Sequence, residues 1–203
     1  MAPSLPSNIT TLQDATFASL LDKLRDPGLL PSQVCALIAQ LTTLLARQTT
    51  IKAESNETIA VVVILRSGLA MFEPLMAEIP ANIPTVTYHL GIFRDKHNLQ
   101  PVEYYNKLPP KPATVRKAIV VDPVIATGGT VGAVVSILKD WGIEKVTFLS
   151  VLASREGAMR VANVWPASTQ FVLGAVDPDL DEKGYIQPGV GDIGDRLFGT
   201  NLV

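Results

Sequence analysis

The loop from Asp122 to Thr130 carries the residues with the clearest chemical potential. A β-branched run, residues 118–121, delivers the acidic Asp122, and Thr-Gly-Gly-Thr at 127–130 follows before an apolar stretch. Adjacent glycines let backbone N–H groups converge, and a helix start adds about half a positive charge. That arrangement suits a phosphate monoester, whereas the carboxylate of Asp122 suits sugar hydroxyls. The loop therefore predicts a sugar-phosphate site, and a strand-to-helix turn with an N-cap is the alternative.

Continuous apolar runs predict the strands that would position this loop. Such runs, typical of strands buried on both faces, occupy residues 59–65, 118–121, 145–152 and 170–173. Helical patterns lie between them, at 69–79, 129–141 and 155–163. The alternation predicts an α/β fold, a parallel sheet flanked by helices on both faces. Ligands of such sheets bind at the carboxyl ends of the strands, so Arg66-Ser67-Gly68 is expected near Asp122.

The N-terminal part, residues 1–55, is expected to be helical. Residues 1–10 are rich in Pro and Ser and should be frayed. A first helical pattern places Leu12 and Leu24 on one face, and a second runs from Val34 to Leu45. Packing or subunit contact is the expected role of this part.

An insertion at residues 85–112 interrupts the alternating pattern. Residues 85–93 and 102–107 could form two strands around a polar turn, which predicts a β-hairpin arm. Its aromatic residues Phe93, Tyr104 and Tyr105 would be wet in a monomer, so a homodimer or a dimer-based tetramer is expected. Residues 1–203 are predicted to form one domain.

Composition excludes several classes of protein. The chain has 203 residues, 17 Lys and Arg against 19 Asp and Glu, and 47% hydrophobic residues, which excludes disorder and a basic nucleic-acid footprint. One cysteine excludes an intrachain disulfide, and with two histidines it argues against a metal site built from side chains. No apolar stretch approaches the roughly 20 residues of a membrane span. We expect a cytoplasmic protein with no membrane or nucleic-acid partner.

The Asp122–Thr130 loop resembles the phosphoribosyl diphosphate (PRPP) loop of the type I phosphoribosyltransferases. Its form, one Asp, then Pro, then Ala-Thr-Gly-Gly, looks like the uracil phosphoribosyltransferase branch. Three further segments are similar to that branch, in the same order: the strand-end loop at 64–69, the hairpin at 91–109, and the uracil-binding hood at 180–200. The resemblance covers about residues 59–200. It implies a type I phosphoribosyltransferase fold with a hairpin arm at 85–112 and a C-terminal hood at 175–203.

The resemblance also implies an activity and a set of site residues. The reaction would convert uracil and PRPP to UMP and pyrophosphate, with Asp122 and Arg94 as the catalytic residues. Arg66 and Arg94 would bind the diphosphate. The ribose and its 5-phosphate would be bound by Asp122, Ala126, Thr127, Gly128, Gly129 and Thr130. Uracil would meet mainly backbone groups of Ile186, Gly191, Asp192 and Ile193, with Asp192 also touching PRPP.

Each of these roles has a structural alternative. Arg66 or Arg94 could form an ordinary surface ion pair, and Asp192 could cap a turn. Mg²⁺ is the implied cofactor, and with so few carboxylates in the motif it would be held mainly by PRPP and water.

The sequence departs from the family pattern at several positions. Ile193 stands where the family more often has a small residue, Ser67 and Ala70 replace common Ala and Gly, and the stretch before about residue 55 matches poorly. In that stretch only Leu24-Arg25-Asp26 is similar to the family, and no role is inferred for it. The divergence leaves a second hypothesis, a protein that senses PRPP or UMP without turnover. A third, an RNA-binding regulator, is disfavoured by the acidic balance. An active enzyme could serve pyrimidine salvage or another uracil-consuming pathway.

Overall fold

A mainly parallel β-sheet forms the centre of the molecule. The structure is a computed structural model that describes residues 4–94 and 101–200. The strands follow the order β1-β8-β7-β5-β2-β3-β4, and all neighbours are parallel except β3 and β4. Their bounds are β1 Ile9–Thr11, β2 Thr58–Leu65, β3 Thr85–Arg94, β4 Pro101–Asn106, β5 Val115–Val121, β7 Lys145–Ser154 and β8 Thr169–Asp177. A two-residue strand, β6 (Val124–Ile125), pairs with β7.

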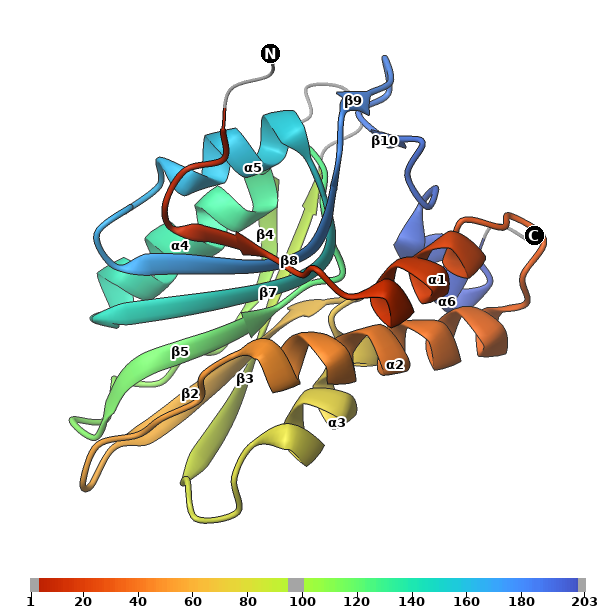
Figure 1. The fold of residues 1–203 in the computed structure, drawn as a ribbon. Helices are drawn as coiled ribbons and strands as arrows, with labels where there is room; N and C mark the ends of the chain where they lie inside the picture. Colours follow the sequence, from red (N-terminus) through yellow and green to blue (C-terminus); the bar gives the residue numbers. More distant parts are fainter. Residues whose placement is uncertain (1–3, 95–100, 201–203) are drawn as a thin grey trace.

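Helices cover both faces of this sheet. On one face lie α1 (Ala15–Leu24), α2 (Pro31–Gln48) and α3 (Leu69–Glu78), and on the other α4 (Gly129–Trp141) and α5 (Arg155–Ala162) (Figure 1). The C-terminal segment after β8 forms the hood, with a small two-stranded sheet of β9 (Asp179–Leu180) and β10 (Ile186–Gln187), followed by α6 (Ile193–Phe198). No helix in the described ranges is long and apolar enough to span a bilayer.

The central strands divide their side chains between two hydrophobic cores. In β2, Ile59, Val61 and Val63 pack with α1, α2 and α3, whereas the intervening residues pack with α4 and α5. Successive side chains of a strand point to opposite faces, so a strand covered on both sides needs an unbroken apolar run. The predicted α/β fold is therefore confirmed, and each predicted central strand and helix is present.

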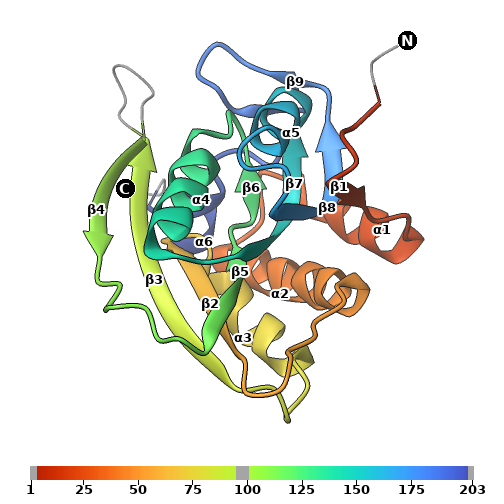
Figure 2. The ribbon, with the colours of Figure 1, turned by 90° about the vertical axis from the view of Figure 1, so that its left-hand side faces the viewer.

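The N-terminal residues differ from the prediction. Ile9–Thr11, expected to be largely frayed, forms β1, which pairs in parallel with β8 from Phe171 to Leu173. Figure 2 shows β1 and β4 at the two edges of the sheet. Leu12 lies between β1 and α1 rather than in the first helix, because Asp14 caps that helix by accepting a bond from the Phe17 N–H at 2.8 Å. An edge strand of three residues is too short to show a hydrophobic pattern in the sequence.

Candidate active site

Two strand ends bring Asp122 and the Arg66-Ser67-Gly68 turn together. Strands β2 and β5 are parallel neighbours in which Val63 pairs with Val121. Gly68 packs against both strands, since a Cβ there would lie 2.6 Å from the carbonyl oxygens of Ile64 and Val121. A side chain at this position would push the turn away from Asp122. The prediction that the turn lies beside Asp122 is confirmed.

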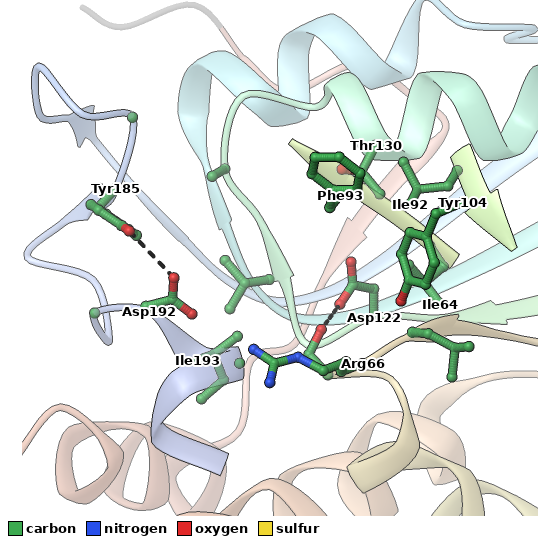
Figure 3. Close-up of a pocket in the computed structure, with 17 residues that line it drawn as sticks. Ile64, Arg66, Ile92, Phe93, Tyr104, Asp122, Thr130, Tyr185, Asp192 and Ile193 are labelled. Atoms are coloured by element: carbon green, nitrogen blue, oxygen red, sulfur yellow. Dashed lines mark hydrogen bonds between the residues drawn. The ribbon is translucent and has the colours of Figure 1, made fainter. Parts of the chain in front are cut away.

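Asp122 is a buried carboxyl with an elevated pKa. Only 7% of its surface is exposed, and the Ser67 hydroxyl donates a 2.6 Å hydrogen bond to its Oδ1 (Figure 3). Burial raises the pKa of Asp122 to about 7, and the Ser67 hydrogen bond opposes part of that rise. The carboxyl can thus change its protonation state near neutral pH.

The loop after Asp122 forms a small cradle at the start of α4. A concavity of about 90 Å³ is lined by backbone and side chains of residues 124–131. Gly128 is the N-cap residue of α4 with φ +77°, and no side chain among the described residues caps the first N–H groups of this helix. Free N–H groups and the helix dipole favour an anion at this place. This geometry favours a phosphate site over the alternative, a strand-to-helix turn with a side-chain N-cap.

Helix α5 supports this loop from behind. The Ser154 hydroxyl donates to the Ala126 carbonyl at 2.6 Å and accepts from the Gly157 N–H at 2.8 Å. A Cβ at Gly157 would lie 2.1 Å from the Ala126 carbonyl oxygen, so the loop backbone rests directly on the helix. The Arg160 guanidinium donates to the Thr127 carbonyl at 3.3 Å. These contacts hold the loop carbonyls on the side away from the cradle opening.

A cavity of about 420 Å³ opens between the strand ends, the hairpin arm and the hood. In Figure 3, Phe93 and Tyr104 of the hairpin face Tyr185, Asp192 and Ile193 of the hood across this cavity, and Asp122 and Arg66 lie between them. The Phe93 and Tyr104 rings are 6.0 Å apart between centroids. Apolar walls with a few convergent polar groups are typical of small-molecule sites.

Arg66 and Asp192 combine structural bonds with access to the cavity. The Arg66 guanidinium lies 3.3 Å from Asp195 Oδ1 and 5.3 Å from the centre of the Phe198 ring, and the side chain is half exposed. Exposed ion pairs contribute little free energy, so Arg66 can exchange Asp195 for an anionic ligand at low cost. Asp192 caps α6 by accepting from the Asp195 N–H at 3.0 Å, and its other oxygen accepts from the Tyr185 hydroxyl at 3.3 Å.

The structure brings most of the sequence-predicted site residues together. The cavity is lined by Arg66, Asp122, Ala126, Thr130, Gly191, Asp192 and Ile193, and the cradle adds Thr127, Gly128 and Gly129. Ile186 is not among the lining residues, because its side chain is buried in the core on the α2 face. Arg94 ends β3, opposite Pro101, and its side chain lies outside the described part of the structure.

Several lining residues were not predicted as site residues. Ser67 was expected near Asp122 as part of the Arg66-Ser67-Gly68 turn but was given no role in binding, and Phe93 and Tyr104 were interpreted only as an aromatic edge. Their contacts depend on how the hairpin folds back, which the sequence alone does not give: the Tyr104 ring packs over Gly91, where a Cβ would lie 2.7 Å from it. Alternation along β4 could have indicated that Tyr104 and Tyr105 face opposite sides.

Side chains alone do not form a metal centre in the described part of the chain. No group of three or more His, Cys, Asp or Glu residues there could hold a metal ion. The cavity nevertheless contains the carboxylates of Asp122 and Asp192. Two separated carboxylates fit a hard cation that receives most of its ligands from a bound substrate and water.

Comparisons with known proteins agree with this geometry. Residues 30–200 match the family model described as uracil phosphoribosyltransferase. The chain belongs to the uracil phosphoribosyltransferase family. The fission yeast Schizosaccharomyces pombe has a relative named putative uracil phosphoribosyltransferase urg2, 45% identical over 194 residues, which cover 96% of this chain and 91% of the relative. The uracil phosphoribosyltransferase of Thermus thermophilus is 42% identical over 151 residues, covering 74% and 70% of the two chains.

Solved structures share the fold. The AQ2163 protein of Aquifex aeolicus has a TM-score of 0.80 at 28% identity, covering 94% of this chain and 97% of that one. An adenine phosphoribosyl transferase of Trypanosoma brucei has a TM-score of 0.56 at 15% identity, with 90% of each chain covered. The second similarity concerns the fold alone and supports the type I phosphoribosyltransferase architecture.

The Ser67→Ala variant is expected to shift the acid limb of the pH profile of kcat/KM for PRPP to higher pH. The Ser67 hydrogen bond stabilises the Asp122 carboxylate, so its loss raises the Asp122 pKa further and protonates the group at higher pH. Among the described side chains, the other ionisable groups facing the cavity are those of Arg66, Tyr104, Tyr185 and Asp192. Initial rates between about pH 5.5 and about pH 9 measure the shift.

The matched control for this variant is Ser150→Ala. Ser150 is fully buried, whereas Ser67 is partly buried, and the Ser150 hydroxyl donates to the Leu152 carbonyl at 3.3 Å, away from the cavity. Its pH profile should match that of the unchanged protein. An identical acid limb in Ser67→Ala and Ser150→Ala would show that the Ser67 bond does not tune Asp122.

Proposed function

We propose that the protein transfers the phosphoribosyl group of PRPP to uracil, giving UMP and pyrophosphate. The observation that carries the proposal is a cavity with two different ends and a cradle beside one of them. At one end the buried carboxyl of Asp122 adjoins the cradle, where the uncapped helix start and its two glycines lie, and the backbone of the hood lies at the other end. The first end suits a ribose 5-phosphate and the second suits a flat base. Membership of the uracil phosphoribosyltransferase family supports the same assignment.

The PRPP half of the site would use the charges around Asp122. We assign the 5-phosphate to the backbone and hydroxyl groups of the cradle, Ala126 to Thr130, and the ribose hydroxyls to the Asp122 carboxylate. Arg66 would bind the diphosphate, and Arg94 would join it from the end of β3. Guanidinium groups pair with phosphate oxygens through two parallel bonds, which fixes the leaving group as well as neutralising it.

In the proposed reaction the bond from the anomeric carbon to pyrophosphate breaks and the bond to uracil N1 forms. The N1 proton of uracil is lost. Mg²⁺ held by PRPP oxygens and water would neutralise charge on the leaving group. The chain's own residues orient the two substrates, and the hairpin and hood exclude water that would otherwise hydrolyse PRPP.

Uracil recognition would come mainly from the hood backbone. Uracil offers two carbonyl acceptors and the N3–H donor, whereas cytosine reverses the pattern at positions 3 and 4. We assign its recognition to backbone groups of Ile186, Gly191, Asp192 and Ile193. A loop that satisfies uracil leaves buried groups unpaired with cytosine, at about 1–3 kcal/mol for each group. Backbone recognition also explains how a bulky Ile193 is compatible with the role.

One assay tests the function directly. Purified protein, PRPP, Mg²⁺ and uracil should yield UMP and an equal amount of pyrophosphate, and cytosine should not replace uracil. Saturable PRPP binding without turnover of any pyrimidine would instead support the sensing hypothesis. We place the reaction in the cytoplasm, as a salvage step for free uracil.

We further propose that the protein, as one domain, forms a homodimer or a dimer-based tetramer through the hairpin arm. Phe93, Val102, Tyr104 and Tyr105 are all more than one third exposed along β3 and β4. Static light scattering at micromolar concentration should give at least twice the monomer mass of 21.8 kDa. Tyr105 does not line the cavity. The Tyr105→Glu variant should have a lower measured mass than the unchanged protein. A fully active monomer would contradict the proposal.

A further inference from the structure

An arginine of the N-terminal part is bound to the hood. The Arg25 guanidinium donates two hydrogen bonds to the Asp177 carboxylate, from Nη1 to Oδ2 at 2.7 Å and from Nη2 to Oδ1 at 2.8 Å. Arg25 Nη1 also donates to the Gly189 carbonyl at 2.9 Å, and the Gly189 N–H donates to Asp177 Oδ2 at 2.9 Å. The N–H and C=O of Gly189 are therefore both held by this one ion pair.

A second arginine, from the hood itself, completes the connection. Arg196 of α6 donates from Nη1 to the Val190 carbonyl at 2.6 Å and to the Leu24 carbonyl at 2.8 Å, and from Nη2 to the Asp26 carbonyl at 2.6 Å. The carbonyls on either side of Arg25 thus hold the hood helix. Helix α6 packs on α2, and the Arg196 side chain reaches from it to the end of α1 at Leu24.

The residues held in this way directly precede the base-binding segment. Gly189 and Val190 lead into Gly191, Asp192 and Ile193, which line the cavity. Gly189 has φ +60°, and a Cβ there would overlap the Ile186 carbonyl oxygen at 1.8 Å, so the chain turns back tightly at this point. A change of side-chain rotamer cannot move a backbone N–H or C=O group. The positions of these groups in the base-binding segment therefore depend on the contacts that hold the loop.

The ion pair is well suited to fix a backbone. Arg25 and Asp177 have side-chain exposures of 23% and 9%, so solvent screens their attraction only partly. Two parallel N–H bonds to one carboxylate define both distance and orientation, which a lysine ammonium cannot reproduce. Recognition sites work only when their groups are held within about 0.5 Å of the productive geometry.

We propose that Arg25, through Asp177, is a positioning residue for uracil, so that the Leu24-Arg25-Asp26 turn sets the geometry of the base-binding segment. The inference rests on the proposed function and adds a specific task for the N-terminal part. The inference predicts different effects on the two substrates. The ion pair between Arg25 and Asp177, here called the clamp, supports the hood, whereas the PRPP cradle is supported by α5 and by β5. Loss of the clamp should therefore affect uracil more than PRPP.

The test compares Arg25→Lys with the unchanged protein in steady-state kinetics. The variant keeps the positive charge but loses the fork of two bonds. The KM for uracil should rise by roughly ten-fold to 100-fold, because a misplacement of about 1 Å can cost about 100-fold. The KM for PRPP should rise several-fold less than the KM for uracil, because Asp192 is the one proposed PRPP contact in the hood, and retained PRPP binding also verifies folding. Asp177→Asn removes the other partner and gives the same test if Arg25→Lys does not fold.

Arg116→Lys is the matched control. Arg116 binds Glu54 at 2.9 Å near the start of β5, at the far end of the sheet from the cavity, and its loss should leave both KM values unchanged. The double variant Arg25→Lys/Asp177→Asn should raise the uracil KM little more than either single change. An unchanged uracil KM, or an equal rise in both KM values, overturns the inference. Failure of the unchanged protein to form UMP would overturn the proposed function instead.

Discussion

Asp122→Asn is expected to lower PRPP turnover by about 10- to 100-fold in a protein that folds normally. The substitution keeps the shape but removes the charge and turns one acceptor oxygen into a donor. If the ribose hydroxyls donate to Asp122, a charge-assisted hydrogen bond worth about 1.5–3 kcal/mol is lost. Steady-state kinetics at saturating and sub-saturating PRPP measure the effect. Binding of inorganic phosphate should be nearly unchanged, because the cradle residues remain.

The same variant should unfold less readily at alkaline pH. The folded-state pKa of Asp122, about 7, lies above the value of about 3.9 for an unfolded chain, so the folded protein binds this proton more tightly. The stability it contributes is full below about pH 4 and is lost as pH rises through about 7. Asn cannot ionise and avoids this loss. The free energy of unfolding of Asp122→Asn should therefore exceed that of the unchanged protein by about 2–4 kcal/mol at about pH 8.

Urea denaturation at about pH 5 and about pH 8 measures the difference in unfolding free energy between Asp122→Asn and the unchanged protein. This difference should be smaller at the lower pH. Asp140→Asn, an isosteric change at an exposed position of α4, is the control and should leave turnover unchanged. Normal kinetics in Asp122→Asn would remove the ribose role and leave Asp122 as a turn residue. A lower stability at pH 8 would show that burial does not raise its pKa.

Gly128→Ala should weaken PRPP binding by about 100-fold. Gly128 has φ +77°, where an L side chain costs about 1–2 kcal/mol, and a Cβ would lie 2.7 Å from Val161 Cγ1 and 3.2 Å from the Gly157 carbonyl. The loop must then move, and the N–H groups at the start of α4 no longer converge. Losing one or two charge-assisted bonds to phosphate gives the stated factor. Calorimetric titration with PRPP measures the affinity.

Gly132→Ala provides the comparison within the same helix. A Cβ there meets nothing closer than Val164 Cγ2 at 3.9 Å, and Ala stabilises a helix interior by about 1 kcal/mol relative to Gly. PRPP affinity should be unchanged and the melting temperature equal or higher. Equal PRPP affinity in Gly128→Ala and Gly132→Ala would contradict the cradle.

The sheet could be predicted from the sequence because burial on both faces leaves a local signature. The runs in β2 and β5 supply both cores, so every position is apolar and no alternation obscures them. Strand β1 carries no such signature. Its three residues acquire strand geometry by pairing with β8, more than 150 residues later, and local sequence cannot report that partner.

The site was predictable to the extent that it lies in continuous segments. The loop from Asp122 to Thr130 combines an acidic strand end, two glycines and a helix start within nine residues, and each has a local physical meaning. The bonds from Ser67 to Asp122 and from Arg25 to Asp177 join residues 55 and 152 positions apart. Such pairs depend on which strands become neighbours and on how the hood folds back, so only the folded chain reveals them.

The clamp between Arg25 and Asp177 has a consequence for how the protein is made. Helix α1 leaves the ribosome 152 residues before its hood partner, which at about 5–20 residues per second is a delay of roughly 8–30 s. During that time Phe17, Leu21 and Leu24, all buried in the folded protein, have no β8 or hood to pack against. The base-binding end of the cavity can form only when synthesis is nearly finished. The nascent chain is therefore a natural client for chaperones that shield apolar helices.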